Sequence, residues 1–194
     1  MAQKLTIVGG MKLRKRLIEK AADLRQKINA HHARLDNTSP TYKTDEAQTK
    51  VVAGWLQAHR DITALMEAIS LSIQETNLKT KVEVVLDNKP ITKSVAAWVL
   101  RRRELAPLDL QAILQLNDAP ENRGLRELSM ADPNDKTKLN VVKVVRHYDV
   151  VNRDKMKDLF AHEPSRIDAA LETINATTEL VGLPEYNEDT LLSA

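Results

Sequence analysis

The sequence has no cysteine and few aromatic residues. With no cysteine among its 194 residues, the chain forms no disulfide and offers no thiol for catalysis or for binding zinc. Phe, Trp and Tyr together make up 3% of the residues, which is too few for a surface that stacks nucleic-acid bases on aromatic rings. The hydrophobic fraction is 42%. The core must therefore consist of Leu, Ile, Val, Ala and Met, a composition common in packed helices.

The chain also lacks an excess of either charge and any long apolar run. Its net charge is +2, whereas nucleic-acid-binding proteins commonly show a strong basic excess, so nucleic acid is not an expected partner. The basic cluster Arg101 to Arg103 would fan around a helix, which favours a solvated face or local ion pairs. No apolar run approaches the roughly 20 residues of a membrane helix, and the first ten residues do not resemble a signal peptide. We therefore expect no membrane interaction.

Recognisable catalytic and metal-binding patterns are missing as well. The chain has five glycines and no phosphate-binding glycine loop, dinucleotide fingerprint or G-x-S-x-G motif. His31 and His32 are adjacent and so point to different helix faces, and the other three histidines are isolated in the sequence. No histidine pair has metal-ligand spacing with a carboxylate. We expect no catalytic residue, no metal and no cofactor.

Two long segments have the spacing of apolar residues that is typical of helices. Residues 11–36 and 45–78 repeat apolar residues every three or four positions, as in a coiled coil. Thr44 is a suitable N-cap for the second segment. The short polar stretch between them, "DNTSPTYKTD", predicts an antiparallel hairpin. In this hairpin Trp55 should pack on Leu24 or Ile28.

The rest of the chain predicts a small β element and further helices. "KVEVVL" (81–86) and the run beginning "LNVVKVVRHY" at residue 139 are rich in β-branched residues and predict strands that pair with each other. "DNKP" after the first strand is a turn signal that also allows a hairpin with residues 90–92. Residues 117–138 predict a long polar loop. Pro107 should kink or divide a third helix. Pro164 should interrupt the last helix or begin a second piece of it at its first turn. The fold class is therefore mainly α (α+β): a long antiparallel helical hairpin or coiled-coil bundle with a two- or three-stranded β element.

Two similar segments suggest buried polar residues. "IQETNLKT" (73–80) and "LETINATT" (171–178) each place Asn and, three residues later, Thr near the end of an apolar seam. A buried Asn costs stability but fixes the register of helices. The candidate polar pins are therefore Asn77, Thr80, Asn175 and Thr178. The alternative is that both segments are solvated helix ends, in which case these side chains face water.

Domain organisation is expected to be an arm, one domain and a tail. Residues 1–10 form an extended N-terminal arm, 11–183 a single helical domain and 184–194 a C-terminal tail. The apolar centre of the arm precedes two glycines that would uncouple it from the helix. If the arm packs on another subunit, burial of each of its apolar side chains could contribute roughly 1 kcal/mol to the free energy of association. The candidate inter-subunit contact is the set Leu5, Thr6, Ile7 and Val8.

Four stretches together resemble the septicolysin-like family of small, mostly helical proteins of bacteria and their phages. They are "KLRKRLIEKAADLRQKI", "ISLSIQETNLKT", "ITKSVAAWVLRRREL" and "IDAALETINATTEL", and the resemblance spans about residues 11–183. It implies a helical bundle with a small β element and no established catalytic residues. The chain departs from the family by its arm and by its longer polar loop, and it has no amphipathic membrane segment of the kind that pore formation needs.

These observations predict a non-enzymatic structural protein that works in a homo-oligomer or a larger protein assembly. The narrower hypothesis is a phage virion component, such as a capsid or tail accessory or decoration protein that ties neighbouring subunits together. The alternative is a cytoplasmic bacterial oligomer that binds a protein partner through its helical faces. An enzyme with an unrecognised site is the third hypothesis.

Overall fold

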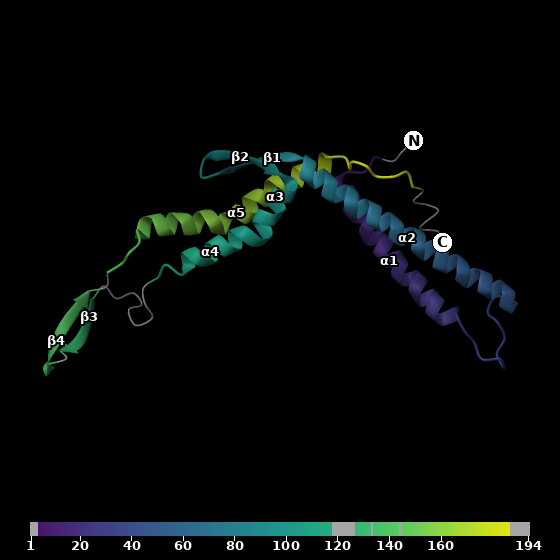
Figure 1. Cartoon of the computed structure of the whole chain (residues 1–194), viewed down its shortest axis with the longest axis horizontal. Helices are drawn as coiled ribbons and strands as arrows, with labels where there is room; N and C mark the ends of the chain where they lie inside the picture. Colours follow the sequence, from purple (N-terminus) through teal and green to yellow (C-terminus); the bar gives the residue numbers. More distant parts are fainter. Residues whose placement is uncertain (1–3, 118–126, 133, 144, 187–194) are drawn as a thin grey trace. The chain divides into compact units, whose positions relative to one another are not determined.

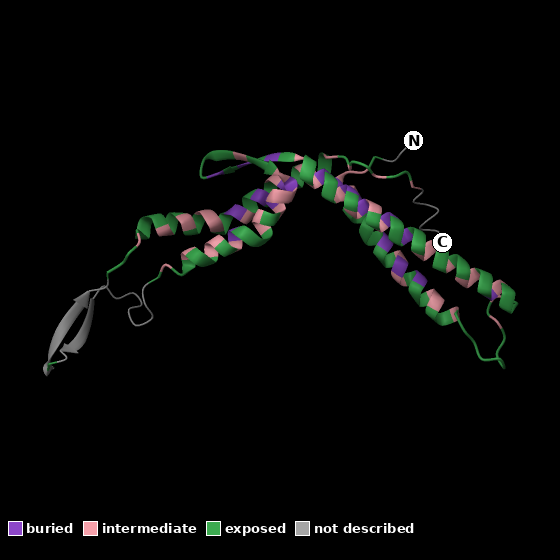
Figure 2. Ribbon diagram, viewed as in Figure 1, coloured by how far each residue is buried: buried purple, intermediate pink, exposed green. Residues whose placement is uncertain are grey.

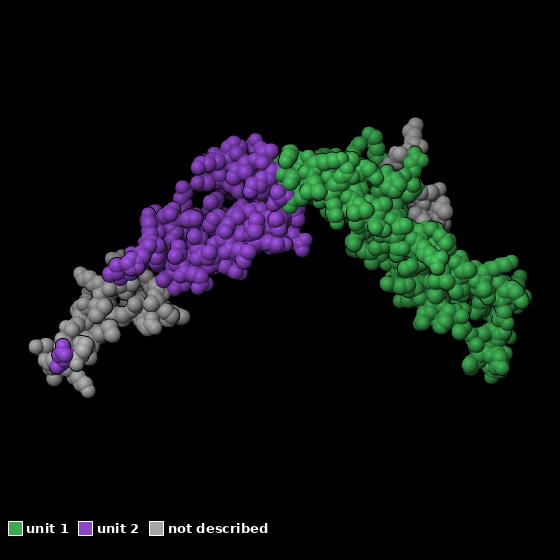
Figure 3. All heavy atoms as spheres, in the orientation of Figure 1, with its two compact units in different colours: residues 1–82, 94–96, 171–194 green, residues 83–93, 97–170 purple. Residues whose placement is uncertain are grey.

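The computed structural model of the chain describes residues 4–117, 127–132, 134–143 and 145–186. Figure 3 shows that the chain divides into two compact units where the sequence predicted one domain over 11–183. Unit 1 comprises residues 1–82, 94–96 and 171–194, and unit 2 comprises residues 83–93 and 97–170. The main apolar cluster draws only on the two N-terminal helices. Long helices that bury one stripe against an adjacent helix build such local clusters rather than one shared core.

Unit 1 is built on the predicted helical hairpin. α1 (Ile7–His31) and α2 (Asp45–Lys79) lie side by side (Figure 1), and Figure 2 shows their buried residues along the facing surfaces. Thr44 caps α2 as predicted, since its hydroxyl accepts a hydrogen bond from the amide of Ala47 at 3.1 Å. The predicted bounds 11–36 of the first helix are corrected, because α1 starts at Ile7 and ends at His31, and Leu35 beyond it is 71% exposed. Within the two helices the predicted apolar spacing is confirmed by the buried cluster Leu13, Leu17, Ala21, Leu24, Ile62, Leu65 and Ile69.

The predicted strands exist, and the hairpin of residues 81–86 with residues 90–92 is confirmed, but the predicted pairing of 81–86 with the strand that begins at residue 139 is wrong. β1 (Lys81–Leu86) pairs with β2 (Lys89–Ser94), and β3 (Glu127–Asp132) pairs with β4 (Asp135–Lys143). Asp87 and Asn88 both have positive φ, at 49° and 59°, as a two-residue hairpin turn requires. Each strand therefore pairs with its neighbour along the chain, which costs less loop-closure entropy than a pairing across more than fifty residues.

The predicted polar loop 117–138 is also corrected in part. Its described portion forms β3 and the start of β4, and residues 118–126 lie outside the described residues. β4 ends at Lys143, before the end of the β-branched run that predicted the strand, and α5 comprises Val150–Thr177.

Of the two prolines that were predicted to interrupt a helix, only Pro107 lies beside a break in the α-helix. A π-helical segment, Arg101–Leu105, separates α3 (Val95–Leu100) from α4 (Ala106–Leu114), and Pro107 lies in the first turn of α4. A wider π turn suits this place, because the proline ring crowds the carbonyl four residues earlier. α5 runs on through Pro164, so the interruption predicted there is wrong.

Unit 2 holds its helices together with buried residues and ion pairs. Trp98, Ala106 and Ile167 are fully buried. Arg101 donates to both carboxylate oxygens of Glu163, at 2.7 and 2.8 Å, and to Asp109 at 2.5 Å. Arg102 pairs with Asp168, so the prediction of local ion pairs in the arginine cluster is confirmed for these two residues. No helix in the described ranges has the length and apolar character needed to cross a membrane.

Candidate functional site

The predicted inter-subunit arm packs on its own chain. The hydroxyl of Thr6 caps α1 by accepting from the amide of Gly9 at 3.2 Å. The amide of Ile7 donates to the carbonyl of Thr178 at 3.0 Å, and the amide of Leu180 donates to the carbonyl of Leu5 at 2.7 Å. Ile7 is completely buried within the chain. The expectation that this segment is an extended arm apart from its own helices is therefore wrong, whereas a contact of Leu5, Thr6, Ile7 and Val8 with another subunit stays a prediction.

The two glycines of the arm are helical residues rather than a hinge. Both belong to α1, whose first residue is Ile7. A Cβ atom on Gly10 would lie 2.6 Å from Cδ1 of Leu180, so the glycine lets the C-terminal segment approach the helix. A glycine pair before an apolar seam can act as a hinge or can let another segment approach the helix closely. The sequence does not show which segment approaches it.

The polar pins are also placed differently from the prediction. Asn77 and Asn175 are half-buried, and their side-chain oxygens are buried without a hydrogen-bond donor, so the expected bonds of these oxygens do not form. Thr80 and Thr178 contribute through their main chains. The carbonyl of Thr80 accepts from Val95 at 3.0 Å, and that of Thr178 accepts from Ile7.

The residues that do act as buried polar pins are Ser72 and Thr76. They are 2% and 1% exposed. Ser72 donates its hydroxyl proton to the carbonyl of Val181 at 2.6 Å, and the hydroxyl of Thr76 accepts from the amide of Val181 at 3.0 Å. Thr76 follows Ile69 and Ile73 at intervals of four and three residues on the apolar face of α2, and a hydroxyl residue at such a position was the available signal for this role.

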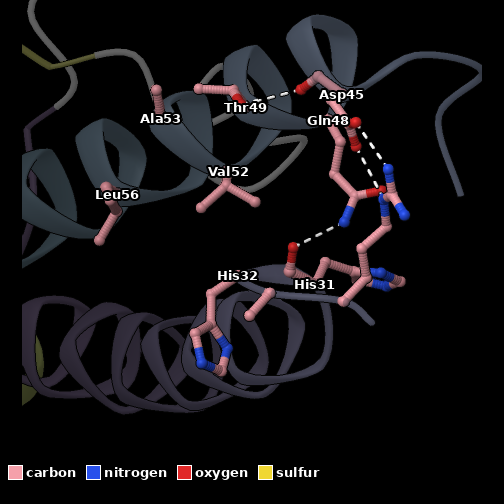
Figure 4. A pocket seen from close by; sticks show the side chains of 10 residues that line it. His31, His32, Asp45, Gln48, Thr49, Val52, Ala53 and Leu56 are labelled. Atoms are coloured by element: carbon pink, nitrogen blue, oxygen red, sulfur yellow. Dashed lines mark hydrogen bonds and ion pairs between the residues drawn. The ribbon is translucent and has the colours of Figure 1, made fainter. Parts of the chain in front are cut away.

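A hollow of about 380 Å³ lies at the loop end of the hairpin, where α1 ends and α2 begins (Figure 4). Arg34 supplies most of its polar contacts. Its Nε and Nη2 donate to the two carboxylate oxygens of Asp45, at 2.8 and 2.6 Å. Its Nη1 donates to the carbonyls of Leu35, Asp36 and Thr38. This arginine thus ties the loop to the first turn of α2, and its donors are occupied.

Gln48 and three rings close the same end. Gln48 is 8% exposed; its amide nitrogen donates to the carbonyl of His31 at 2.8 Å and its amide oxygen accepts from the amide of Thr41 at 2.9 Å. The ring centroid of His31 lies 5.6 Å from that of Tyr42 and 5.5 Å from that of Trp55. Trp55 also packs against the buried cluster that contains Leu24, which agrees with the predicted packing.

The ion pair between Arg34 and Asp45 is unsuited to acid–base chemistry. The hydrogen bonds from Arg34 hold the pKa of Asp45 below its ordinary value, and the same bonds raise the pKa of Arg34. Both groups therefore stay ionised at neutral pH, whereas a general acid or base works best with a pKa near the operating pH. Across the described part of the chain, no three His, Asp or Glu side chains are grouped to hold a metal ion.

A second hollow of about 390 Å³ adjoins the first. Its lining is Arg25, Ile28, Asn29, His32, Leu56 and His59, and it shares His32 and Leu56 with the first hollow. The Nδ1 of His32 donates to the carbonyl of Asn29 at 2.9 Å, since a carbonyl can only accept. We call the two hollows together the hairpin groove. Most of its polar groups bind one another, which leaves apolar side chains such as Leu56, 43% exposed, open to a partner.

Comparison with known proteins supports the fold alone. A crystal structure of a functionally unknown conserved protein from Corynebacterium diphtheriae is similar to this chain, with a TM-score of 0.50 and 16% sequence identity. The similarity covers 92% of this chain and 99% of the other. No family model and no curated protein matches the chain. The resemblance to the septicolysin-like family stays a prediction.

Proposed function

We propose that the chain is a non-enzymatic assembly protein that binds other protein chains, including a second copy of itself, through exposed helical faces. The observation that carries this proposal is an exposed, mostly apolar and uncharged stripe that begins at the last residue of the π-helical segment and continues along α4 to its C-cap. Leu105 is 41% and Leu108 is 59% exposed, and Ala112 and Gln115 are exposed beside them. The four residues are spaced three, four and three apart, which is the spacing of a coiled-coil seam.

The stripe suits a second copy of α4. If two copies lie antiparallel, Leu108 of each faces Ala112 of the other, and Leu105 faces Gln115, so the longest apolar side chains meet shorter or flexible ones. The stripe has no charge, so like-charge repulsion does not oppose self-pairing. The charged residue within α4, Asp109, is already bound by Arg101.

Analytical ultracentrifugation of the full chain tests the proposal. We expect reversible self-association, and we expect Leu108→Asp to shift the chain to the monomer. Fully burying a leucine contributes about 1.5–3 kcal/mol, so losing it should weaken association tenfold or more. Val151→Asp is the matched control, because Val151 is 78% exposed on α5 and lies outside the stripe. Association that Leu108→Asp leaves unchanged would contradict the role of α4, and a chain that stays monomeric at every concentration would contradict the homo-oligomer.

The narrower proposal is that this assembly is a phage virion. It rests on the sequence resemblance and on the assembly role together. The position of the gene tests it: capsid or tail genes beside it would support a virion component. Neighbouring genes of ordinary bacterial metabolism would favour the cytoplasmic oligomer.

A further inference from the structure

We infer that the hairpin groove binds an acidic amphipathic helix of a partner protein. The inference rests on the proposed assembly function, because it takes the chain to act by binding other chains. It concerns unit 1, whereas the α4 stripe lies in unit 2, so the two surfaces can be tested separately.

The floor of the groove is apolar and open. Ile28 of α1 and Val52 of α2 are half-buried, and Leu56 is 43% exposed between the two hollows. Figure 4 shows Val52 and, one turn further along α2, Leu56 on the side of the helix that faces the cavity. Two adjacent helices with an apolar floor between them form a surface that receives the apolar face of a third helix.

A row of exposed residues runs along α1 from the groove toward the start of the helix. Met11, Ile18, Arg25 and His32 follow one another at intervals of seven residues, so they lie on nearly one face of the helix. Arg25 and His32 line the groove, and Met11 and Ile18 are 48% and 41% exposed. α1 has 25 residues, which is about 37 Å at 1.5 Å per residue. The row of residues from Met11 to His32 is therefore long enough to contact several turns of a partner helix.

The charges of α1 select an acidic partner. The helix has seven cationic side chains and two anionic ones, and Asp23 pairs with two of the cations, Lys20 and Lys27. Within the groove, Arg34 and Asp45 neutralise each other. Arg25 is exposed and has no ion pair there, and His32 and His59 lie beside it. Carboxylates on the flanks of a docked helix would meet these groups, whereas lysines would be repelled.

Two designed helical peptides test the inference with the full chain. Both carry the same leucine stripe; one has glutamates on its flanks and the other has lysines. Fluorescence anisotropy should show that the acidic peptide binds about tenfold or more tightly than the basic one, and that added salt reduces the difference. Arg25→Glu should reduce or reverse the preference for the acidic peptide while leaving the apolar contacts in place.

Two further variants separate the groove from the rest of the hairpin. Leu56→Asp should abolish binding of the acidic peptide, because it places a charge on the apolar floor. Leu71→Asp is the control, since Leu71 is 57% exposed on α2 and lines neither hollow. Circular dichroism shows whether each variant keeps its helices.

Three results would overturn the inference. They are equal binding of both peptides, no binding of the acidic peptide, and binding that Leu56→Asp leaves intact. Self-association that depends on Leu56 would assign the groove to a second copy and would equally reject the acidic partner. None of these results affects the test at Leu108, so the proposed function can survive the failure of this inference.

Discussion

At the scale of single residues, two glycines of unit 1 have opposite requirements. Gly54 lies within α2, and a Cβ atom built on it would meet nothing within 4 Å. Gly182 has a φ of +71° after the end of α5, a conformation that side chains with a Cβ adopt at a cost. The first glycine is thus replaceable, whereas the backbone at the second requires glycine.

Alanine at these two positions should change stability in opposite directions. Gly54→Ala should raise the free energy of unfolding by about 0.5–1 kcal/mol, because alanine restricts the unfolded chain and favours the helix. Gly182→Ala should lower it by about 1–2 kcal/mol, because alanine is strained at positive φ. Urea unfolding followed by circular dichroism measures both. A loss of stability in Gly54→Ala would mean that α2 has a partner on that side.

The hydroxyl of Thr76 should matter more than the neighbouring amide of Asn77. Thr76→Val keeps the shape of the side chain but leaves the amide of Val181 without its acceptor. This should cost about 1–3 kcal/mol of unfolding free energy. Asn77→Leu should be close to neutral or stabilising, because the buried side-chain oxygen of Asn77 accepts no hydrogen bond. If Asn77→Leu proves the more damaging of the two, the original assignment of Asn77 as a polar pin is restored.

At the scale of helices and strands, the arginine of the π-helical segment holds unit 2 together. Glu163 is 2% exposed, and Arg101 meets it with two hydrogen bonds while also binding Asp109. These carboxylates raise the pKa of Arg101, with the hydrogen bond to Glu163 contributing most. The pair links the π-helical segment to α5, two elements far apart in the sequence.

Breaking this pair from one side should be costly. Arg101→Met leaves the buried carboxylate of Glu163 without its partner and should lower the free energy of unfolding by about 3–5 kcal/mol. The double variant Arg101→Met/Glu163→Leu should recover much of that loss, because no buried charge remains. Lys79→Gln is the control; it removes an exposed pair with Glu75 and should cost less than about 1 kcal/mol. Additive losses in the double variant would show that the two side chains act independently.

The elements themselves could be predicted where the sequence has a regular period. Apolar residues every three or four positions, with Thr44 as a cap, gave the hairpin and the contact of Trp55 with the core. Strand partners could not be predicted, because β-branched runs indicate strands without indicating which strands meet. The groove was missed, because Arg34, Asp45 and Gln48 come together only once the loop closes the hairpin.

At the scale of the whole molecule, unit 1 is formed by the two ends of the chain. The N-terminal hairpin and the segment from Leu171 onward belong to the same compact unit. Thr6 and Glu179 form a β-bridge beside the bonds from Ile7 to Thr178 and from Leu180 to Leu5. The contact between the two ends of the chain could not be predicted, because neither segment has a sequence pattern that identifies the segment it pairs with. The N-terminal segment was therefore assigned to another subunit.

Truncation of the chain after Thr177 tests this closure. It removes Thr178, Leu180 and Val181, which bind the start of α1 and the Ser72–Thr76 pair. The truncated chain should unfold at lower urea concentration than the full chain.

Ile7→Ala should lower the free energy of unfolding by about 2–5 kcal/mol in the full chain, because Ile7 is completely buried. The same change should cost much less after truncation, because Ile7 has then lost its C-terminal neighbours. Val8→Ala, at a half-buried position, is the control. Equal costs of Ile7→Ala in the two chains would show that the C-terminal segment does not bury Ile7, and would return the N-terminal residues to a role outside their own subunit.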